Sequence, residues 1–204
     1  MSSTVPAPPP LGVSLKLTYG LGSVAYGVSV AVLANSVLQL YFNQVIGLPA
    51  VWVGLAIMVS LLADVVIDPL IGYASDNLRS RWGRRHPFMY LSALPVGVFF
   101  YFLWHAPKGL DGVPLLLFAV GMLVAVRVAI ASYEIPSTSL APELAPDYDE
   151  RTKLLAYRWF FGIGAIAVVS ILLYAVFLRQ DAANPLGVLN RGRYAEFGTV
   201  MRSE

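Results

Sequence analysis

Five ionisable residues interrupt stretches of the chain that are otherwise apolar: Asp64, Asp68, Arg127, Glu134 and Arg158. Asp64 and Asp68 are four residues apart, which places their side chains about 40° apart on one face of a helix. Two carboxylates this close raise the free energy of keeping each other ionised in the membrane, unless a cation or a proton is shared between them. Their spacing therefore predicts a site that binds a small cation. The plainer alternative is a purely structural role for both aspartates.

Arg127 and Glu134 are seven residues apart, so they share one helix face to within about 20°. With Arg158 and the two aspartates they form a set of three carboxylates and two arginines, which one monovalent cation or proton would neutralise. Helical rise places these groups at a similar depth, and we expect three helices to bring them into one polar pocket. The alternatives are a helix-end charge for Glu134 and a snorkelling or topology-fixing side chain for Arg158.

The composition indicates a membrane protein. Of the 204 residues, 57% are hydrophobic and only 13% are charged, whereas a soluble domain carries about 25% charged residues. The net charge of +2 leaves no surplus for phosphates, so nucleic acid is not an expected partner. With no cysteine and two histidines, the chain lacks the ligands of thiolate or histidine metal sites. We expect no organic cofactor.

Five stretches are long and apolar enough to span a bilayer as helices. They cover residues 17–42, 51–74, 88–105, 113–135 and 154–178. We expect residues 1–15 to form a disordered cytoplasmic tail and residues 16–178 to form a unit of five helices. Residues 179–204 are expected to hold an external connector and the start of an incomplete sixth helix.

The orientation follows from the basic residues, because cytoplasmic loops retain Lys and Arg. The first connector has no charge, whereas the second carries Arg79, Arg81, Arg84 and Arg85. This asymmetry places the second connector and the amino terminus in the cytoplasm. Arginines beyond the fifth span favour the opposite orientation, but short loops weigh more in this rule.

The second span and its connector carry a family signature. Residues 64–76 read DVVIDPLIGYASD, and residues 79–88 read RSRWGRRHPF. Further motifs are KLTYGLG at 16–22, EIP at 134–136 and ELAPDYDERT at 143–152. This set resembles the glycoside–pentoside–hexuronide:cation symporters of the major facilitator superfamily. The resemblance implies an all-α polytopic membrane protein, of which this chain is the amino-terminal portion, with about five transmembrane helices and the start of a sixth.

The resemblance also implies roles for single residues. Asp64 and Asp68 would coordinate the coupling ion, Na⁺ or H⁺, and Glu134 would contact both the ion and the sugar. Arg158 would bind sugar hydroxyls. Glu134 and Arg158 are therefore expected substrate-binding residues, and we expect Tyr26 and Arg127 to bind the substrate with them. Arg127 has no counterpart in the family pattern, and by neutralising part of the acidic cluster it favours a proton over sodium.

A third group of residues is expected to act in conformational change. By the same resemblance, Asp76 would form a cytoplasmic charge lock with Arg84 and Arg85 that holds the outward-facing state. Gly72 would permit close helix approach beside it.

The predicted function is symport of a sugar or glycoside with a monovalent cation by alternating access, without enzymatic activity. We expect an integral protein of the bacterial inner membrane, whose partners are the sugar, the bilayer and a missing carboxy-terminal half or a complementing chain. One alternative is a nonfunctional or accessory fragment of such a transporter. A remote alternative is an intramembrane aspartyl protease, although that chemistry needs aspartates from two helices.

Overall fold

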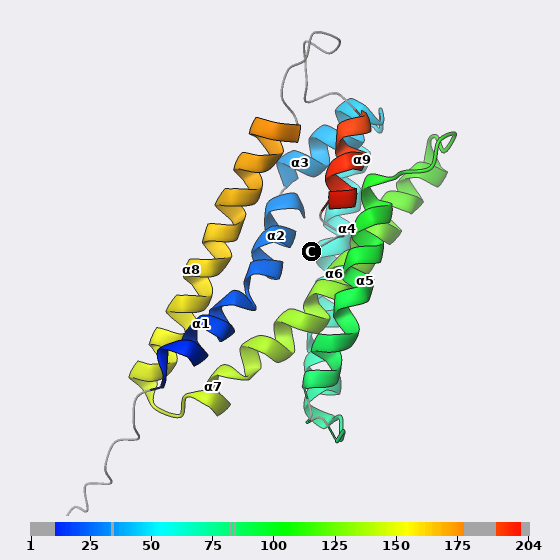
Figure 1. Ribbon diagram of the computed structural model, residues 1–204. Coiled ribbons are helices and arrows are strands. Elements are labelled where there is room, and N and C mark those ends of the chain that lie inside the picture. Colours follow the sequence, from blue (N-terminus) through cyan, green and yellow to red (C-terminus); the bar gives the residue numbers. More distant parts are fainter. Residues whose placement is uncertain (1–10, 34, 82, 84, 178–190, 201–204) are drawn as a thin grey trace, which may run out of the picture.

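The computed structural model describes residues 11–33, 35–81, 83, 85–177 and 191–200, and every regular element in those ranges is helical. Figure 1 shows them along the chain. The elements are α1 (Val13–Leu21), α2 (Val24–Leu33), α3 (Asn35–Gln39), the π-helix η1 (Leu40–Val45), α4 (Ala50–Asn77), α5 (His86–Trp104), α6 (Val113–Ser139), α7 (Ala141–Leu144), α8 (Tyr148–Leu172), the π-helix η2 (Leu173–Phe177) and α9 (Arg191–Val200).

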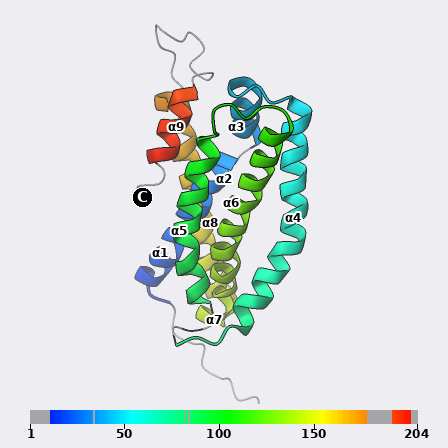
Figure 2. The ribbon, with the colours of Figure 1, turned by 90° about the vertical axis from the view of Figure 1, so that its right-hand side faces the viewer.

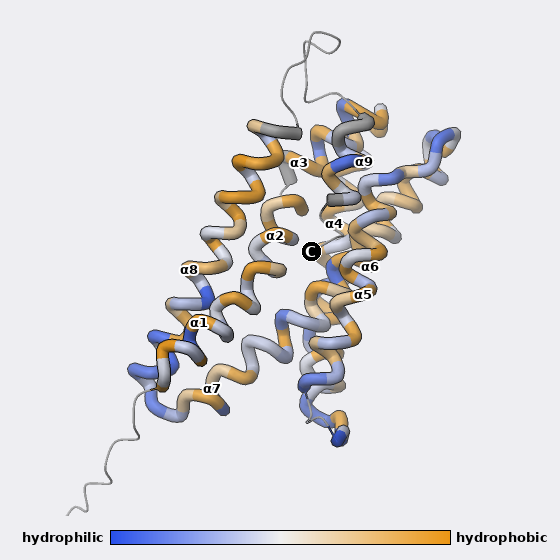
Figure 3. The backbone as a smooth tube through the Cα atoms, viewed as in Figure 1, coloured by the Kyte–Doolittle hydropathy of each residue, from blue (hydrophilic) through white to orange (hydrophobic). Residues whose placement is uncertain are grey.

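The five predicted membrane spans are confirmed as helical segments. The segments long and apolar enough to cross a bilayer are Val13–Leu33, Ala50–Asn77, His86–Trp104, Val113–Leu144 and Tyr148–Ala175. Apolar residues dominate their middle parts, and hydrophilic residues gather at the lower ends (Figure 3). The fifth segment begins earlier than predicted because Asp147 caps α8, its carboxylate accepting hydrogen bonds from the backbone N–H groups of Asp149 and Glu150.

The first predicted span, 17–42, is not one continuous helix. The helix is interrupted between α1 and α2, at Gly22 and Ser23. The Ser23 hydroxyl lies 2.7 Å from the carbonyl oxygen of Gly20 and 2.6 Å from that of Arg158. Gly20 and Gly22 lower the local helix propensity. The hydrogen bond from Ser23 connects the interrupted segment to α8.

The long helices pack as two groups (Figures 1 and 2). α1 and α2 lie along α8, whereas α4 and α5 lie along α6. The lower end of α6 continues through α7 to the start of α8 and so connects the two groups. This arrangement makes α6 the central helix of the fold.

An aromatic cluster closes the upper end of the bundle. The Tyr41 hydroxyl of η1 donates a 2.7 Å hydrogen bond to the carbonyl oxygen of Trp104 at the end of α5. Tyr194 of α9 stacks on the Trp104 ring, with centroids 5.6 Å apart and planes 11° apart. All three side chains are fully buried. α9, which lies within the predicted start of a sixth helix, is therefore packed against the third span.

Glycines allow α2 and α8 to approach closely. A Cβ atom at Gly27 would overlap the backbone carbonyl oxygen of Gly162, and it would lie 2.9 Å from the Cβ of Ala165. Backbone cannot yield as a flexible side chain can, so only glycine fits at this point of the helix pair.

Replacement of Gly27 by valine should therefore destabilise the chain. We expect a cost of about 1–3 kcal/mol, as for other overpacked interiors, measured as a lower melting temperature of the purified protein in detergent. Gly54→Val in α4 is the control, because a Cβ at Gly54 meets no atom within 4 Å. Equal destabilisation by both changes would contradict the packing described here.

Candidate functional site

Arg158 is a buried cation at the junction of three spans. Its side chain lies on α8 and is 6% exposed. Nη2 lies 2.5 Å from Glu134 Oε2 on α6, and Nη1 donates a 2.7 Å hydrogen bond to the Ser137 hydroxyl. The guanidinium carbon lies 5.4 Å from the ring centroid of Tyr19 on α1. An unpaired arginine would be costly at this depth, and these contacts supply its partners.

The local sequence explains how α6 presents two groups to one arginine. Glu134 and Ser137 are three residues apart, so they lie on the same face of the helix. The carbonyl oxygen of Ser137 accepts a 2.8 Å hydrogen bond from the Tyr19 hydroxyl, which draws α1 to the same place. The carboxylate and the guanidinium are thus held by three helices.

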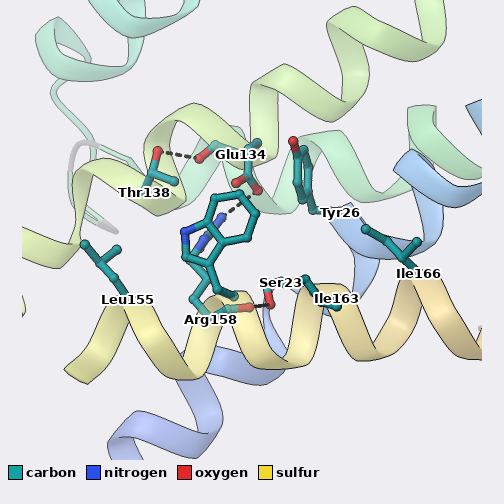
Figure 4. Close-up of a pocket in the computed structure, with 10 residues that line it drawn as sticks. Ser23, Tyr26, Glu134, Thr138, Leu155, Arg158, Ile163 and Ile166 are labelled. Carbon is teal, nitrogen blue, oxygen red and sulfur yellow. Dashed lines mark hydrogen bonds and ion pairs between the residues drawn. The ribbon is translucent and has the colours of Figure 1, made fainter. Parts of the chain in front are cut away.

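A cavity of about 120 Å³ adjoins this pair. Figure 4 shows Tyr26, Glu134 and Arg158 side by side at its wall. Its other lining residues are Ser23, Thr138, Leu155, Trp159, Gly162, Ile163 and Ile166. The cavity holds roughly four water molecules, less than the roughly 300 Å³ of a usual ligand pocket. This cavity alone is therefore too small for a usual ligand.

The lining combines the groups that recognise a polyhydroxylated ligand. The Glu134 carboxylate accepts hydrogen bonds, the Arg158 guanidinium donates them, and the Tyr26 hydroxyl can do either. Trp159 is 65% exposed and offers an aromatic face to apolar C–H groups. Such a wall suits a sugar better than a purely apolar molecule.

A second intramembrane ion pair lies between α4 and α6. Arg127 Nη1 is 2.7 Å from Asp64 Oδ2, and the two side chains are 20% and 25% exposed. Asp68, one turn further along α4, is exposed. Arg127, predicted as a substrate-binding residue, is thus placed at Asp64 and not among the residues that line the cavity.

The structure does not gather the three carboxylates in one pocket. Asp64 and Asp68 are absent from the wall that holds Glu134. No group of three acidic or histidine side chains close enough to hold a metal ion occurs among the residues that the structure describes. The reason is the packing, because α4 lies on α6 whereas α8 lies on α1 and α2. The sequence could not reveal these helix neighbours.

Arg85 is the centre of a charge network at the lower end of the bundle. Its Nη2 lies 2.8 Å from Asp76 Oδ1, and its Nη1 lies 3.0 Å from Glu143 Oε1 of α7. It also donates a hydrogen bond to the carbonyl oxygen of Ser139. The start of α5 is thereby fastened to the end of α4 and to the α6–α7 junction. Arg84, predicted as a second partner of Asp76, lies outside the described residues.

The close approach expected at Gly72 is not required by the packing. A Cβ atom there would lie 3.7 Å from Cγ2 of Ile135 on α6, which is an ordinary van der Waals distance. α4 and α6 would therefore accommodate an alanine at this position.

Several residues of the site were not singled out from the sequence. Ser137 had a usable signal, since it follows Glu134 by three residues on a helix face. Trp159 follows Arg158 directly, but an aromatic residue in an apolar span does not by itself indicate a ligand. Glu143 lies in a connector motif, and its contact with Arg85 depends on tertiary packing.

Comparison with known proteins gives a consistent result. Residues 18–202 match the family described as MFS/sugar transport protein. An uncharacterized symporter of Synechocystis is 34% identical over 164 residues, which cover 78% of this chain and 30% of that protein. The isoprimeverose transporter of Lactiplantibacillus pentosus is 29% identical, covering 78% and 33%. An inner membrane symporter of Escherichia coli is 26% identical, covering 87% and 38%. The chain thus spans about a third of the length of these relatives.

The coupling between Glu134 and Arg158 can be measured as a double-mutant cycle. Glu134→Gln alone leaves the buried guanidinium without its counter-charge and should cost roughly 3 kcal/mol. Arg158→Gln alone should cost a similar amount, whereas the double variant should cost clearly less than the sum. Unfolding of the purified chain in mixed micelles, followed by tryptophan fluorescence, gives these values. Asp111→Asn, in an exposed connector, serves as the control. Strict additivity of the two changes would show that the side chains do not interact.

Proposed function

Because the chain belongs to the MFS/sugar transport protein family, we propose that it is the amino-terminal portion of a transporter that carries a sugar or glycoside together with Na⁺ or H⁺. The observation that carries this proposal is the wall formed by Tyr26, Glu134, Arg158 and Trp159. It combines a hydrogen-bond acceptor, a donor and an aromatic face inside an apolar bundle. Two of the relatives are named as symporters, and one as a transporter of isoprimeverose.

Sugar hydroxyls can supply hydrogen bonds that the ion pair leaves unmade, because Arg158 Nη2 and Glu134 Oε2 are buried without a hydrogen-bond partner among the described residues. Glu134 accepts from a hydroxyl on one side of the ring and Arg158 donates to another, while the exposed indole of Trp159 covers an apolar ring face. Binding is selective because a ligand that separates Glu134 from Arg158 without replacing their contacts leaves a buried charge unpaired. The substrate class is therefore a polyol ring and not a fatty or aromatic molecule.

In this proposal the carboxylates of α4 and α6 supply the coupling. Asp64, Asp68 and Glu134 are the candidate cation-binding residues, and a bound ion or proton neutralises the carboxylate that it meets. Coupling arises when the ion and the sugar each favour the same conformation of the carrier, since each then raises the affinity for the other. The protease alternative finds no support, because Asp64 faces an arginine and shares α4 with Asp68.

The site is completed by a second half or a complementing chain. Large apolar side chains are exposed on α4 and α8, among them Val65, Leu70 and Ile163. They face lipid or protein in the membrane. Alternating access then consists of one half rocking against the other around the sugar. We place the carrier in the bacterial inner membrane, with the amino terminus and the Arg85 network on the cytoplasmic side.

The Arg85 network is the proposed lock of the outward-facing state. Asp76 and Glu143 hold the start of α5 through a single guanidinium. Breaking both contacts would free this end of the bundle for inward opening. Gly72 lies one turn before Asp76, on the same helix.

Uptake by the complete transporter in proteoliposomes tests the function. We expect accumulation of at least one labelled monosaccharide or glycoside, and loss of more than about 90% of it in Arg158→Gln, since each tenfold loss corresponds to only about 1.4 kcal/mol. Asp111→Asn should transport like the parent protein. Correctly inserted protein that takes up no sugar or glycoside would refute the proposal.

The lock can be tested by hydrogen–deuterium exchange. In the double variant Asp76→Asn/Glu143→Gln, amide exchange in the second turn of α5 should rise by about tenfold, because opening becomes about 1.4 kcal/mol easier. The same peptides in Asp111→Asn should stay as protected as in the parent. Unchanged protection in the double variant would mean that Arg85 does not hold this end closed.

A further inference from the structure

The Arg127–Asp64 pair lies deep in the membrane-spanning part of the fold. Asp64 and Arg127 lie equally far along the chain from the first residues of α4 and α6, which places both roughly 21 Å along their helices. The two helices run in the same direction (Figure 2). The contact of 2.7 Å is therefore made at matched depth. Neither side chain reaches a helix end, so Arg127 is not a snorkelling residue at the membrane surface.

These residues do not fit a sodium ion held between Asp64 and Asp68. A hard cation needs several oxygen ligands, and one oxygen of Asp64 already contacts a guanidinium. Glu134 contacts Arg158 and so supplies no third carboxylate. A sodium ion about 5 Å from a fixed positive charge, at an effective dielectric constant of about 20, would lose roughly two orders of magnitude in affinity. Sodium, one of the two ions that the resemblance implies, is thus repelled by a charge of the chain itself.

The guanidinium is also incompletely satisfied. Arg127 Nε is buried and has no hydrogen-bond partner among the described residues. A purely structural arginine–carboxylate pair is commonly bidentate, whereas only one hydrogen bond joins this pair. Asp68 lies one turn beyond Asp64 on α4 and is exposed. It offers a second acceptor within the reach of a long side chain.

We infer, on the basis of the proposed function, that Arg127 is a cation attached to the chain that takes the place of sodium at Asp64. The guanidinium supplies the positive charge that a free ion supplies in a sodium-coupled carrier. Sugar binding in this transporter therefore needs no sodium. Arg127 is the residue that determines ion specificity, and its removal opens the site to sodium.

Direct binding of ²²Na⁺ to the purified complete transporter tests this inference. The parent protein should retain no ²²Na⁺ above the background measured with excess unlabelled sodium. Arg127→Gln should bind ²²Na⁺ with an affinity higher by roughly a hundredfold, and Arg127→Gln/Asp64→Asn should lose that binding. Arg127→Lys keeps the positive charge and should bind no ²²Na⁺ above the background. Saturable sodium binding by the parent protein overturns the inference even if the variants fail to fold.

Sugar uptake measured in the same preparations separates the two proposals. Uptake by the parent protein should be equal in sodium and in choline buffers. Uptake that sodium raises by about tenfold or more would overturn the role of Arg127 while leaving sugar transport intact. An absence of all sugar uptake would refute the proposed function, whereas the ²²Na⁺ measurement would still decide the role of Arg127.

Discussion

The fold depends on one constraint, that a charge within the bilayer must meet an opposite charge or a polar partner. α6 carries two such charges of opposite sign, Arg127 and Glu134, two turns apart. The first meets Asp64 on α4 and the second meets Arg158 on α8. Because α4 and α8 belong to different helix groups, the two ion pairs fasten both groups to the central helix.

The same constraint links stability to function. In the Glu134–Arg158 pair, the two charges neutralise each other until a ligand with its own donors and acceptors enters the cavity. Such a site binds selectively, because a molecule that cannot replace the lost contacts leaves a buried charge unpaired. The Asp64–Arg127 pair works differently, since its positive charge is covalently part of the chain. α6 thus positions two different ion pairs. The Glu134–Arg158 pair can exchange its contacts for those of a ligand, whereas the cation of the Asp64–Arg127 pair is part of the chain.

The sequence predicted the spans well, because a run of about twenty apolar residues has few structural alternatives. The placement of Asp64 and Asp68 one turn apart on α4 follows from their spacing alone. The sequence did not predict that Asp64 and Glu134 would each take a different arginine, because helix neighbours are decided by packing. The interruption at Ser23 was missed for the same reason, as its hydroxyl contacts the backbone of α8. The sequence did not indicate a role for Trp159, because its position at the cavity depends on helix packing.

Solid-state NMR of the chain in lipid bilayers tests the pairing of the intramembrane charges most directly. Dipolar recoupling between ¹⁵N-labelled arginine side chains and ¹³C-labelled carboxylates reports contacts of a few ångströms. We expect Arg127→Gln to remove one arginine–aspartate coupling and Arg158→Gln to remove one arginine–glutamate coupling, each leaving the other in place. Spectra in which neither substitution removes a coupling would show that these arginines are not paired in the membrane.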